Sequence, residues 1–422
     1  MLKSADLTVI VLSAGLSTRF GELHKALAPP LGVGLLPKTA ESLKTLNLTN
    51  NSLVVTGHRA PEVAALAESF GLKTVHNAGF TQGMASSILT GLEAAADGPV
   101  MILPVDAALV SPQSILAVIG LFRSLTPKDQ DAALIIPTHK GRCGHPPLLG
   151  PNLRKKILEL KPTNLRVFLS GLLDPSWVSR YQEGLAPLDP PTNGPIRFVE
   201  RPDVGVLTDI DTPTDYEASL NLPVTLAPWP NPWDLFALLE LVGPGQRVIR
   251  HSLGVAKGAL RLSRSLKDKL GPQLVNPLLG FLGGLIHDVD RLEKKHEAQG
   301  EARLRAIGYP RLGRLVGQHK DLTWPPAAND WDLRDLYGAM ALYLADKYLI
   351  ETEFVSLSER FATKIDSFDN PKAKSKGQAR LANALKVETW FRNKLGQEPG
   401  AVCHQRTLDP LEELADKLAS EV

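Results

Sequence analysis

The first half of the chain alternates short apolar runs with amphipathic stretches. Residues 9–12 (Val-Ile-Val-Leu) and 100–103 (Val-Met-Ile-Leu) are fully apolar, which is typical of strands buried on both faces. Further strands are predicted at 52–56, 74–75 and 132–137, and helices at 36–46, 61–70, 86–96 and from 111 onward. This alternation predicts an α/β fold with a mostly parallel sheet, whose ligands bind beyond the carboxyl ends of the strands.

The pattern changes after residue 220. Residues 221–233 contain four prolines and no periodicity, which predicts a stiff linker. Helical patterns follow with hardly any strands. We therefore expect a first domain at 1–220, the linker, an all-α domain at 234–350 and a helical C-terminal extension at 351–422. Within the extension, residues 373–377 predict a flexible break. The amphipathic stretches of the extension would pack on the helical domain or on a second subunit. No chemistry is evident in this segment.

Composition narrows the class of protein. The chain has 422 residues, 43% hydrophobic and 22% charged, which fits two or three soluble globular domains. Its formal charge of +2 gives no electrostatic case for nucleic-acid binding, and no apolar run reaches the roughly 20 residues of a membrane span. Cys143 and Cys403 show no disulfide or metal spacing, and the N-terminus has no signal pattern, so a cytoplasmic location is expected.

Candidate chemistry begins where the first strand ends. Ser13-Ala14-Gly15-Leu16-Ser17 is a loop of mostly small residues, which lets the backbone approach a ligand closely. Arg19 and Lys25 follow it. Backbone N–H groups with cations behind them favour phosphate binding. A simple tight turn between strand and helix is the alternative.

Two more segments lie at predicted strand ends. Residues 77–87 (NAGFTQGMASS) lead into a helix, and either the serines cap that helix or the loop presents amides and hydroxyls to a nucleotide. Asp106 lies just past the apolar strand at 100–103. A carboxylate there is well placed to hold Mg²⁺, with an ordinary turn aspartate as the alternative.

Two late motifs complete the first half. Residues 141–147 read GRCGHPP and residues 209–215 read DIDTPTD. Together with AGLSTRFG at 14–21, Lys25, the 77–87 loop and Asp106, they resemble, in order, the motifs of nucleotidyltransferases of the molybdenum-cofactor (MobA/MocA) type over residues 7–218. Ala107-Ala108 stands where the family usually has Gln-Pro.

This resemblance implies a Rossmann-like nucleotidyltransferase sandwich and a set of site residues. Arg19, Lys25 and Asp106 would be catalytic, and Mg²⁺ would be held by Asp106 with Asp209, or else Asp211. The acceptor would lie against Gly144 and His145. The nucleotide-binding positions carried over are Leu12, Ser13, Ala14, Gly15, Ser17, Gly83, Ser86 and Ser87.

The activity implied is transfer of an NMP from an NTP to a phosphorylated acceptor such as molybdopterin, with release of pyrophosphate. CTP is favoured over GTP because the opening loop has Ser-Ala-Gly where guanylyltransferases tend to have a Gly-Gly pair. A molybdoenzyme or a second copy of the chain is a conceivable partner.

The second half concentrates imidazole and carboxylate groups on predicted helices. A lone histidine on an apolar helix is usually a core residue, but several on helices that must pack together favour a metal site of Fe, Mn, Zn or Ni. The residues are His251, His287, Asp288, His296, His319 and Asp346.

This H…HD…H…H…D order resembles the HD-domain metal-dependent phosphohydrolases over residues 234–350. The resemblance implies primary ligands at His251, His287, Asp288 and Asp346, with His296 and His319 added in members that bind two metals. Two alternatives stay open. In the first, only the HD part is an enzyme, and a non-catalytic nucleotide-binding first half regulates it. In the second, neither half catalyses a reaction, and the whole chain is a nucleotide-responsive binding module.

Overall fold

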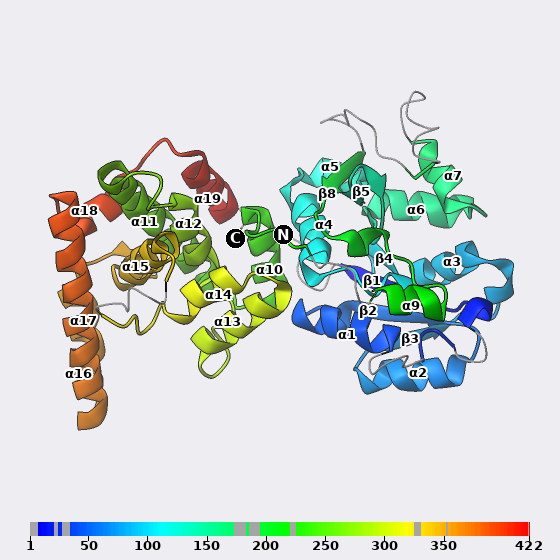
Figure 1. The fold of residues 1–422 in the computed structure, drawn as a ribbon, viewed down its shortest axis with the longest axis horizontal. Coiled ribbons are helices and arrows are strands. Elements are labelled where there is room, and N and C mark those ends of the chain that lie inside the picture. The colour runs from blue at the N-terminus through cyan, green and yellow to red at the C-terminus, as the bar shows by residue number, and fades with distance from the viewer. Residues whose placement is uncertain are drawn as a thin grey trace. The chain divides into compact units, whose positions relative to one another are not determined.

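The computed structural model describes residues 7–20, 24–27, 34–172, 183–184, 195–219, 225–324, 331–351, 353–420 and 422. Gly21 of the opening motif and residues 221–224 of the predicted linker lie outside the described residues. The chain forms two compact units that divide between Leu241 and Val242. Figure 1 colours the N-terminal unit from blue to green and the C-terminal unit from green to red.

The N-terminal unit is built on a mixed, mostly parallel sheet. Its strands are β1 (Thr8–Ser13), β2 (Ser52–Thr56), β3 (Lys73–His76), β4 (Val100–Pro104), β5 (Leu134–His139), β6 (Arg142–Cys143), β7 (Leu148–Leu149) and β8 (Ile196–Glu200). They lie in the order β3-β2-β1-β4-β7-β5-β6, with β8 paired to β5. The pairs β1–β2, β1–β4, β2–β3 and β5–β8 are parallel, and β7 runs antiparallel between β4 and β5.

The register brings three strand ends to one edge. Ser13 of β1 pairs with Thr56 of β2, and Leu12 pairs with Pro104 of β4. The loops that follow these strands therefore start side by side, and they include the opening loop and the segment with Asp106. The sheet thus gathers segments from distant points of the sequence.

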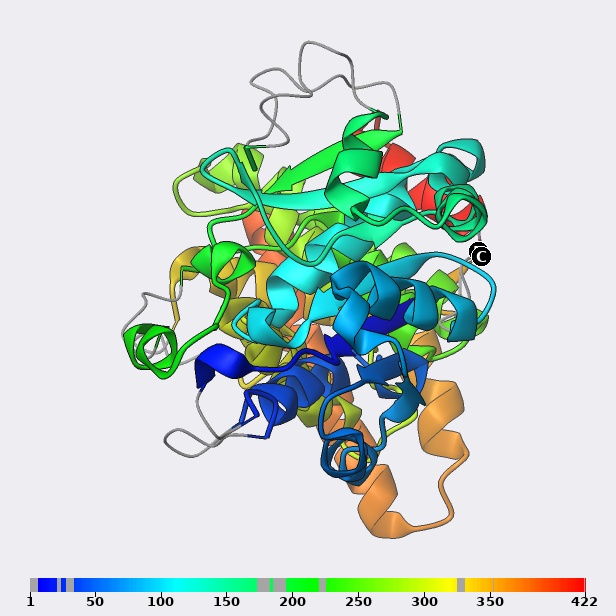
Figure 2. The ribbon, with the colours of Figure 1, turned by 90° about the vertical axis from the view of Figure 1, so that its right-hand side faces the viewer.

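Helices cover both faces of this sheet, as Figure 2 shows from the side of the N-terminal unit. Ile10 and Leu12 pack with residues of α3 (Met84–Ala94), α6 (Pro151–Leu160) and α7 (Leu165–Ser170). Val9 and Val11 alternate with them and are also fully buried, so the other face is covered too. The remaining helices are α1 (Leu35–Thr45), α2 (Ala60–Ser69), α4 (Pro112–Ser124), α5 (Pro127–Ala132) and α9 (Pro213–Ser219).

Helix α10 (Pro232–Val242) packs on the N-terminal unit. Arg123 of α4 binds Glu240 through two hydrogen bonds of 2.5 and 2.6 Å, and both groups are buried. Gln113 donates to the carbonyl of Ala227 at 2.9 Å. The division between units therefore follows α10, whereas the sequence places residue 234 at the start of the second domain.

The C-terminal unit is helical. Its helices are α11 (Gln246–Leu270), α12 (Pro277–Ile286), α13 (His296–Ile307), α14 (Pro310–Gly317), α15 (Leu333–Lys347), α16 (Leu357–Asp366), α17 (Pro371–Leu395), α18 (Pro399–His404) and α19 (Pro410–Ser420). A short hairpin joins β9 (Leu349–Ile350) to β10 (Glu353–Phe354). Helices α11, α12 and α15 pack on one another. The contact between α11 and α12 is tight, since a Cβ at Gly284 of α12 would lie 2.5 Å from Ala256 Cα of α11.

The prediction of a flexible break at 373–377 is wrong. Helix α17 runs without interruption from Pro371 to Leu395. Gly377 is buried, and a Cβ there would lie 2.8 Å from Ile365 of α16. The small residue therefore serves close packing of α16 on α17, which sequence periodicity does not distinguish from a break.

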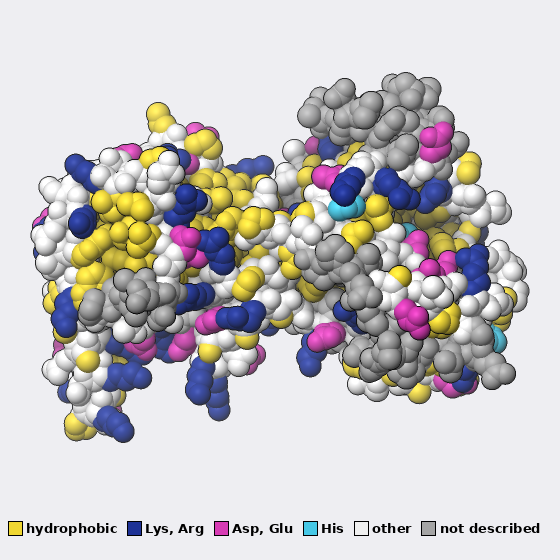
Figure 3. Space-filling model, viewed as in Figure 1, with side chains coloured by type: hydrophobic (Ala, Val, Ile, Leu, Met, Phe, Trp, Pro, Cys, Tyr) yellow, Lys and Arg dark blue, Asp and Glu magenta, His cyan; other side chains and the backbone are white. Residues whose placement is uncertain are grey.

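The visible surface agrees with the nearly balanced charge of the sequence. Basic and acidic side chains are interspersed over the face drawn in Figure 3. Within the described ranges, the structure has no helix with both the length and the apolar character needed to cross a bilayer.

Candidate functional site

The edge of the sheet in the N-terminal unit brings together four of the predicted site residues. Asp106 lies in a 3₁₀ turn directly after β4, and Lys25 follows the opening loop. Lys25 Nζ donates to Asp106 Oδ2 at 2.5 Å and to Asp211 Oδ1 at 3.2 Å. Arg19 Nη1 donates to the other oxygen of Asp211 at 2.8 Å. Cations and carboxylates from three distant segments thus meet at one place.

Asp209 and His145 belong to the same cluster. The N–H of Ile210 donates to the backbone oxygen of Asp106 at 3.1 Å, which ties the two acidic segments together. Burial raises the pKa of Asp209, which His145 opposes, whereas the charges of Asp106 and Asp211 add to the rise. Burial lowers the pKa of His145, which Asp209 and Asp106 oppose. Three carboxylates close enough to affect one another favour a cation between them.

His145 is held by the chain around it. Its N–H donates to Val206 O at 2.8 Å, and a Cβ at Gly144 would lie 2.0 Å from that oxygen. The His145 Nδ1 atom is buried and has no hydrogen-bond partner among the described residues.

The loop at residues 77–87 is organised by Asn77. Its amide donates to Ser86 Oγ at 2.9 Å and Ser87 Oγ at 3.0 Å, and its oxygen accepts from the N–H of Gly79 at 2.9 Å. Helix α3 begins at Met84 after Gly83, so the serines lie inside the first turn and do not cap it. The capping alternative is therefore wrong, and the hydroxyl of Ser86 is shared with Gly79 O and Gly83 O.

Two histidines support the opening loop, and the motifs do not point to them. His24 Nε2 contacts Gly15 O at 3.1 Å, while its Nδ1 accepts from the N–H of Ala26 at 3.3 Å. The His24 and His58 rings stack at 6.0 Å. The N–H of His58 donates to Ala14 O at 3.2 Å. Leu12, Ser13 and Ala14 are buried, whereas Gly15 is exposed.

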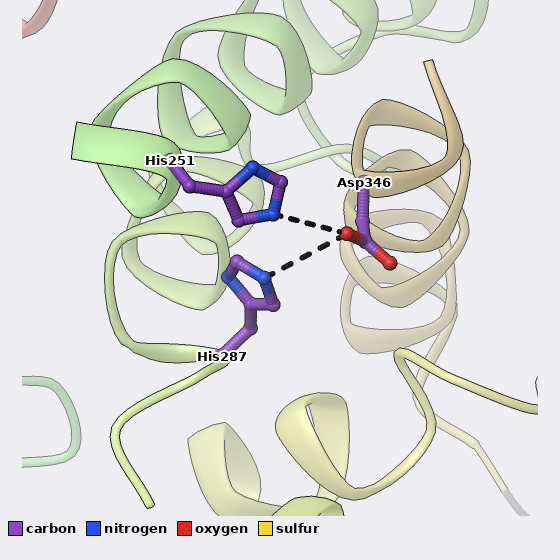
Figure 4. Close-up of side chains that lie close together, drawn as sticks. All are labelled: His251, His287 and Asp346. Atoms are coloured by element: carbon purple, nitrogen blue, oxygen red, sulfur yellow. Dashed lines mark hydrogen bonds and ion pairs between the residues drawn. The ribbon is translucent and has the colours of Figure 1, made fainter. Parts of the chain in front are cut away.

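The C-terminal unit brings together all six predicted ligand residues. Figure 4 shows His251 from α11 and His287 from the end of α12, which both point at one oxygen of Asp346 on α15. The distances from Asp346 Oδ1 are 3.3 Å to His251 Nε2 and 3.8 Å to His287 Nε2. These residues form one group of potential metal ligands.

Asp288 forms a second group with two histidines. Its Oδ1 lies 3.2 Å from His296 Nε2 and 3.6 Å from His319 Nε2. Its other oxygen lies 3.6 Å from His287 Nε2. One carboxylate therefore joins the two groups, an arrangement suited to two neighbouring metal ions.

The ring orientations fit metal binding. His287 Nδ1 donates to Gly284 O at 2.8 Å, and His319 Nδ1 donates to Val316 O at 2.6 Å. Because a carbonyl oxygen only accepts, each Nε2 keeps its lone pair and turns it toward the carboxylates. His287 Nε2 is buried without a hydrogen-bond partner in the described part of the chain. Lone pairs that face carboxylate oxygens repel, and a divalent cation between them removes that cost.

Burial also shifts the pKa values of these ligands. Burial lowers the pKa of His287, and burial together with the charge of His287 lowers that of His319 to about 3. Both imidazoles are therefore neutral, as metal ligands must be. Burial raises the pKa of Asp346, but Lys347 and the hydrogen bond with His251 outweigh it, so the carboxyl stays ionised.

Basic residues surround these ligands, and the sequence motif does not contain them. Lys347 Nζ donates to Asp346 Oδ2 at 2.6 Å and to His319 O at 2.9 Å. Arg291 Nη1 lies 3.5 Å from Asp288 Oδ1 and 3.2 Å from His296 Nε2. Lys347 follows Asp346 directly and Arg291 follows Asp288 by three residues, so their closeness in sequence was a usable signal.

The ligands open into a cavity of about 560 Å³. Its lining includes His251, Asp288, His296, His319 and Asp346, together with residues of α16 and α17. The pairing of buried metal-type ligands with a cavity is the arrangement expected of an active site.

Comparison with known proteins finds similarity over the first half of the chain. A family model described as the MobA-like NTP transferase domain matches residues 9–175. No curated protein matches the chain. Among solved structures, a nucleotidyl transferase from Methanothermobacter thermautotrophicus is 22% identical, covers 51% of this chain and 95% of its own, and has a TM-score of 0.38.

Two further structures are similar over the same half. The Rv0371c protein of Mycobacterium tuberculosis H37Rv is 20% identical over 52% of this chain and 100% of its own, with a TM-score of 0.37. CTP:phosphocholine cytidylyltransferase from Streptococcus pneumoniae is 16% identical over 51% of this chain and 97% of its own, with a TM-score of 0.34. Values this low carry no argument about ligands. The stretch of this chain that is similar to the MobA-like NTP transferase family is thus residues 9–175, which hold the opening loop, Lys25 and Asp106.

Proposed function

We propose that the N-terminal unit transfers an NMP, namely CMP from CTP, to a phosphorylated acceptor of the molybdopterin type, with release of pyrophosphate. The observation that carries this proposal is the meeting of Lys25, Asp106 and Asp211 at the edge of the sheet. Lys25 and Asp106 lie in the region that the MobA-like NTP transferase model matches. Phosphoryl transfer needs position and charge neutralisation more than covalent chemistry, and this cluster supplies both.

Each residue has a role in this reaction. Arg19 and Lys25 neutralise triphosphate oxygens, and the N–H groups of the loop at Gly15 and Ser17 bind the phosphates. Asp106, Asp209 and Asp211 present the oxygen ligands that Mg²⁺ prefers, and when bound Mg²⁺ withdraws charge from the phosphates. The acceptor phosphate attacks the α-phosphorus, the new P–O bond forms, and the bond to pyrophosphate breaks.

The choice of nucleotide and acceptor rests on the resemblance of the opening loop. Pyrophosphate release from each of the four NTPs with molybdopterin tests it. We expect release with CTP, and Asp106→Ala abolishes it. Exclusive use of GTP would overturn the choice of CTP, and turnover unchanged in Asp106→Ala would overturn the transferase assignment.

We also propose that the C-terminal unit is an HD-type metal-dependent phosphohydrolase. The supporting observation is the set of neutral imidazoles and ionised carboxylates whose donor atoms face one another beside a cavity. His251, His287, Asp288, His296, His319 and Asp346 would hold one or two ions of Fe, Mn, Zn or Ni. Such ions, when bound, supply a nucleophile from water at neutral pH and withdraw charge from the phosphoryl group.

The chain's own residues orient this reaction. Water oxygen joins phosphorus, the ester P–O bond breaks, and the alcohol leaves with a proton. Lys347 fixes the Asp346 carboxylate by binding its outer oxygen, so that Oδ1 faces His251 and His287. Metal analysis of the purified chain, combined with hydrolysis of p-nitrophenyl phosphate in Mn²⁺, tests the assignment. Metal-free protein that takes up no Mn²⁺ would favour a non-catalytic binding module.

A further inference from the structure

Part of the wall of the C-terminal cavity comes from the extension, in which the sequence shows no motif. Eight lining residues lie on or between α16 and α17, namely Arg360, Phe361, Ile365, Phe368, Ala373, Lys376, Gly377 and Arg380. Residues of the extension, in which no chemistry is evident from the sequence, therefore line the same space as His251 and Asp346.

Specific bonds hold α16 and α17 against the segments that surround the candidate metal ligands. Arg360 donates to the carbonyl of Leu349, and its Nη2 lies 3.8 Å from Asp346 Oδ1. Asn383 of α17 donates to Leu322 O at 2.8 Å, and Tyr348 donates to Glu388 at 2.6 Å. The two helices therefore have a defined position relative to the ligands, which a specificity wall requires.

With metal ions bound, the charge of the cavity would exceed what one phosphate monoester balances. Its lining holds seven cationic residues, which are Arg247, Arg291, Lys320, Lys347, Arg360, Lys376 and Arg380. The acids of the lining are Asp288, Asp346 and Glu351. Glu297 and Asp321, which bind Lys320 and Arg380, raise the acids to five against seven cations. Metal ions would increase this positive excess, so the cavity suits an occupant with several negative charges.

The same wall is also apolar. Phe361, Ile365 and Phe368 come from the α16–α17 segment, and Ile350 comes from the hairpin before it. Lys376 is exposed at the cavity, one residue before the buried Gly377. These aromatic and aliphatic side chains give an organic group a surface on which to pack, which a free inorganic ion would not need.

We propose that α16 and α17 select the substrate of the C-terminal site, and that this substrate is a phosphate ester with a second anionic group and an apolar organic part. The inference rests on the proposed phosphohydrolase function and adds the chemistry of its substrate. The scissile phosphate lies at the histidines and carboxylates. Lys376 receives the second anion, and Phe361, Ile365 and Phe368 contact the organic part.

The test compares two probes on the Mn²⁺-loaded full chain. CDP has two phosphates and an aromatic base, whereas p-nitrophenyl phosphate has one phosphate and an aromatic ring. Lys376→Ala should raise KM for CDP by about tenfold, because one charge-assisted contact is lost. Its kcat for CDP, and its kcat and KM for p-nitrophenyl phosphate, should stay within about twofold of the wild-type values. Lys374→Ala, an exposed lysine of the same helix outside the cavity, is the matched control and should change neither.

The apolar part is tested with a third probe. Phe368→Ala should raise KM for CDP and p-nitrophenyl phosphate but leave inorganic pyrophosphate unchanged. The inference would be overturned if Lys376→Ala raised KM for CDP and for p-nitrophenyl phosphate equally. It would also be overturned if Lys374→Ala raised KM for CDP as much as Lys376→Ala does.

The same variants separate this inference from the proposed function. If no probe is hydrolysed, the phosphohydrolase assignment fails, and calorimetric binding of the same probes still reports on the wall. Weaker binding of CDP to Lys376→Ala alone then supports the wall, and equal binding to wild type, Lys376→Ala and Lys374→Ala contradicts it.

Discussion

At the scale of single residues, both sites have basic side chains on the atoms that are suited to bind metal. Lys25 lies against Asp106 in the N-terminal unit, and Arg291 lies against Asp288 and His296 in the C-terminal unit. Carboxylates that are largely removed from water need a positive partner. A metal ion must therefore compete with these side chains for the same oxygen and nitrogen atoms.

Arg291→Gln should strengthen metal binding at the Asp288, His296 and His319 group. The guanidinium no longer competes for Asp288 Oδ1 and His296 Nε2, which are 3.5 and 3.2 Å from Arg291 Nη1. We expect the weaker of two Mn²⁺ dissociation constants to fall by about tenfold, the weight of one charged contact. Calorimetric titration of the metal-free protein measures both constants.

Arg305→Gln is the control for this change. Arg305 pairs with Glu301 at 3.0 Å on the surface of α13, away from the ligands. Its Mn²⁺ constants should equal those of wild type. Weaker binding of the second ion to Arg291→Gln would show that the arginine supports the group and does not compete.

Lys25→Met should weaken binding of Mg²⁺–CTP by about tenfold or more, because a charge-assisted contact to the triphosphate is lost. Equilibrium dialysis with labelled CTP measures the effect. Lys44→Met, on the exposed side of α1, serves as control. Equal affinity of wild type and Lys25→Met would remove Lys25 from the nucleotide site.

The sequence predicts residues that belong to ordered motifs, and the structure brings those residues together. His24 and His58 support the opening loop, but they were missed because their contacts are with backbone atoms and with each other. Lys376 and Arg380 were missed for another reason. Their proximity to His319 arises only when α17 packs against the unit, and no local spacing records it.

At the scale of elements, the start of α10 depends on a buried carboxyl. Asp234 is 5% exposed, and its Oδ2 accepts from the N–H of Asn231 at 3.1 Å. Burial raises the pKa of Asp234 to about 6, against the opposing effects of that hydrogen bond and of Arg201. Below about pH 6 the protonated form is therefore favoured in the folded state.

Asp234→Asn should change how stability depends on pH. The folded pKa lies above the unfolded value, so the stabilising contribution is complete below about pH 4 and is lost as pH rises through about 6. The free energy of unfolding of the N-terminal unit should gain about 3 kcal/mol in the variant relative to wild type between pH 4 and 7.5. Denaturation at several pH values measures this difference, and a difference independent of pH would contradict it.

Gly284→Ala tests the contact between α11 and α12. The added Cβ would lie 2.5 Å from Ala256 Cα, and backbone cannot move aside as a side chain can. We expect the C-terminal unit to lose about 1–3 kcal/mol in unfolding free energy, as overpacking does. Gly400→Ala is the control because its Cβ would meet only ordinary contacts at 3.7 Å or more. Equal melting of the two variants would contradict the tight packing.

Element prediction works where apolar runs are long and fails where pairing is tertiary. The strand at 52–56 is observed as β2, whereas β6 and β7 have two residues each and no period to detect. They exist because β7 pairs antiparallel with both β4 and β5, and because β6 pairs antiparallel with β5. The predicted break in α17 fails because a glycine selected for close packing looks the same in sequence as a helix breaker.

At the scale of the whole molecule, each unit contains a complete set of site residues. Lys25, Asp106 and Asp211 all lie in the N-terminal unit, and His251, Asp288 and Asp346 all lie in the C-terminal unit. Because neither set borrows a residue from the other unit, we expect the two chemistries to be separable by single substitutions.

The most direct test of the account compares Asp106→Ala and His251→Asn in the full chain. Both variants are assayed for CTP-dependent pyrophosphate release with molybdopterin and for Mn²⁺-dependent hydrolysis of p-nitrophenyl phosphate. We predict that Asp106→Ala loses only the first activity and His251→Asn only the second. Loss of both activities in either correctly folded variant, or retention of pyrophosphate release in Asp106→Ala, would contradict the account.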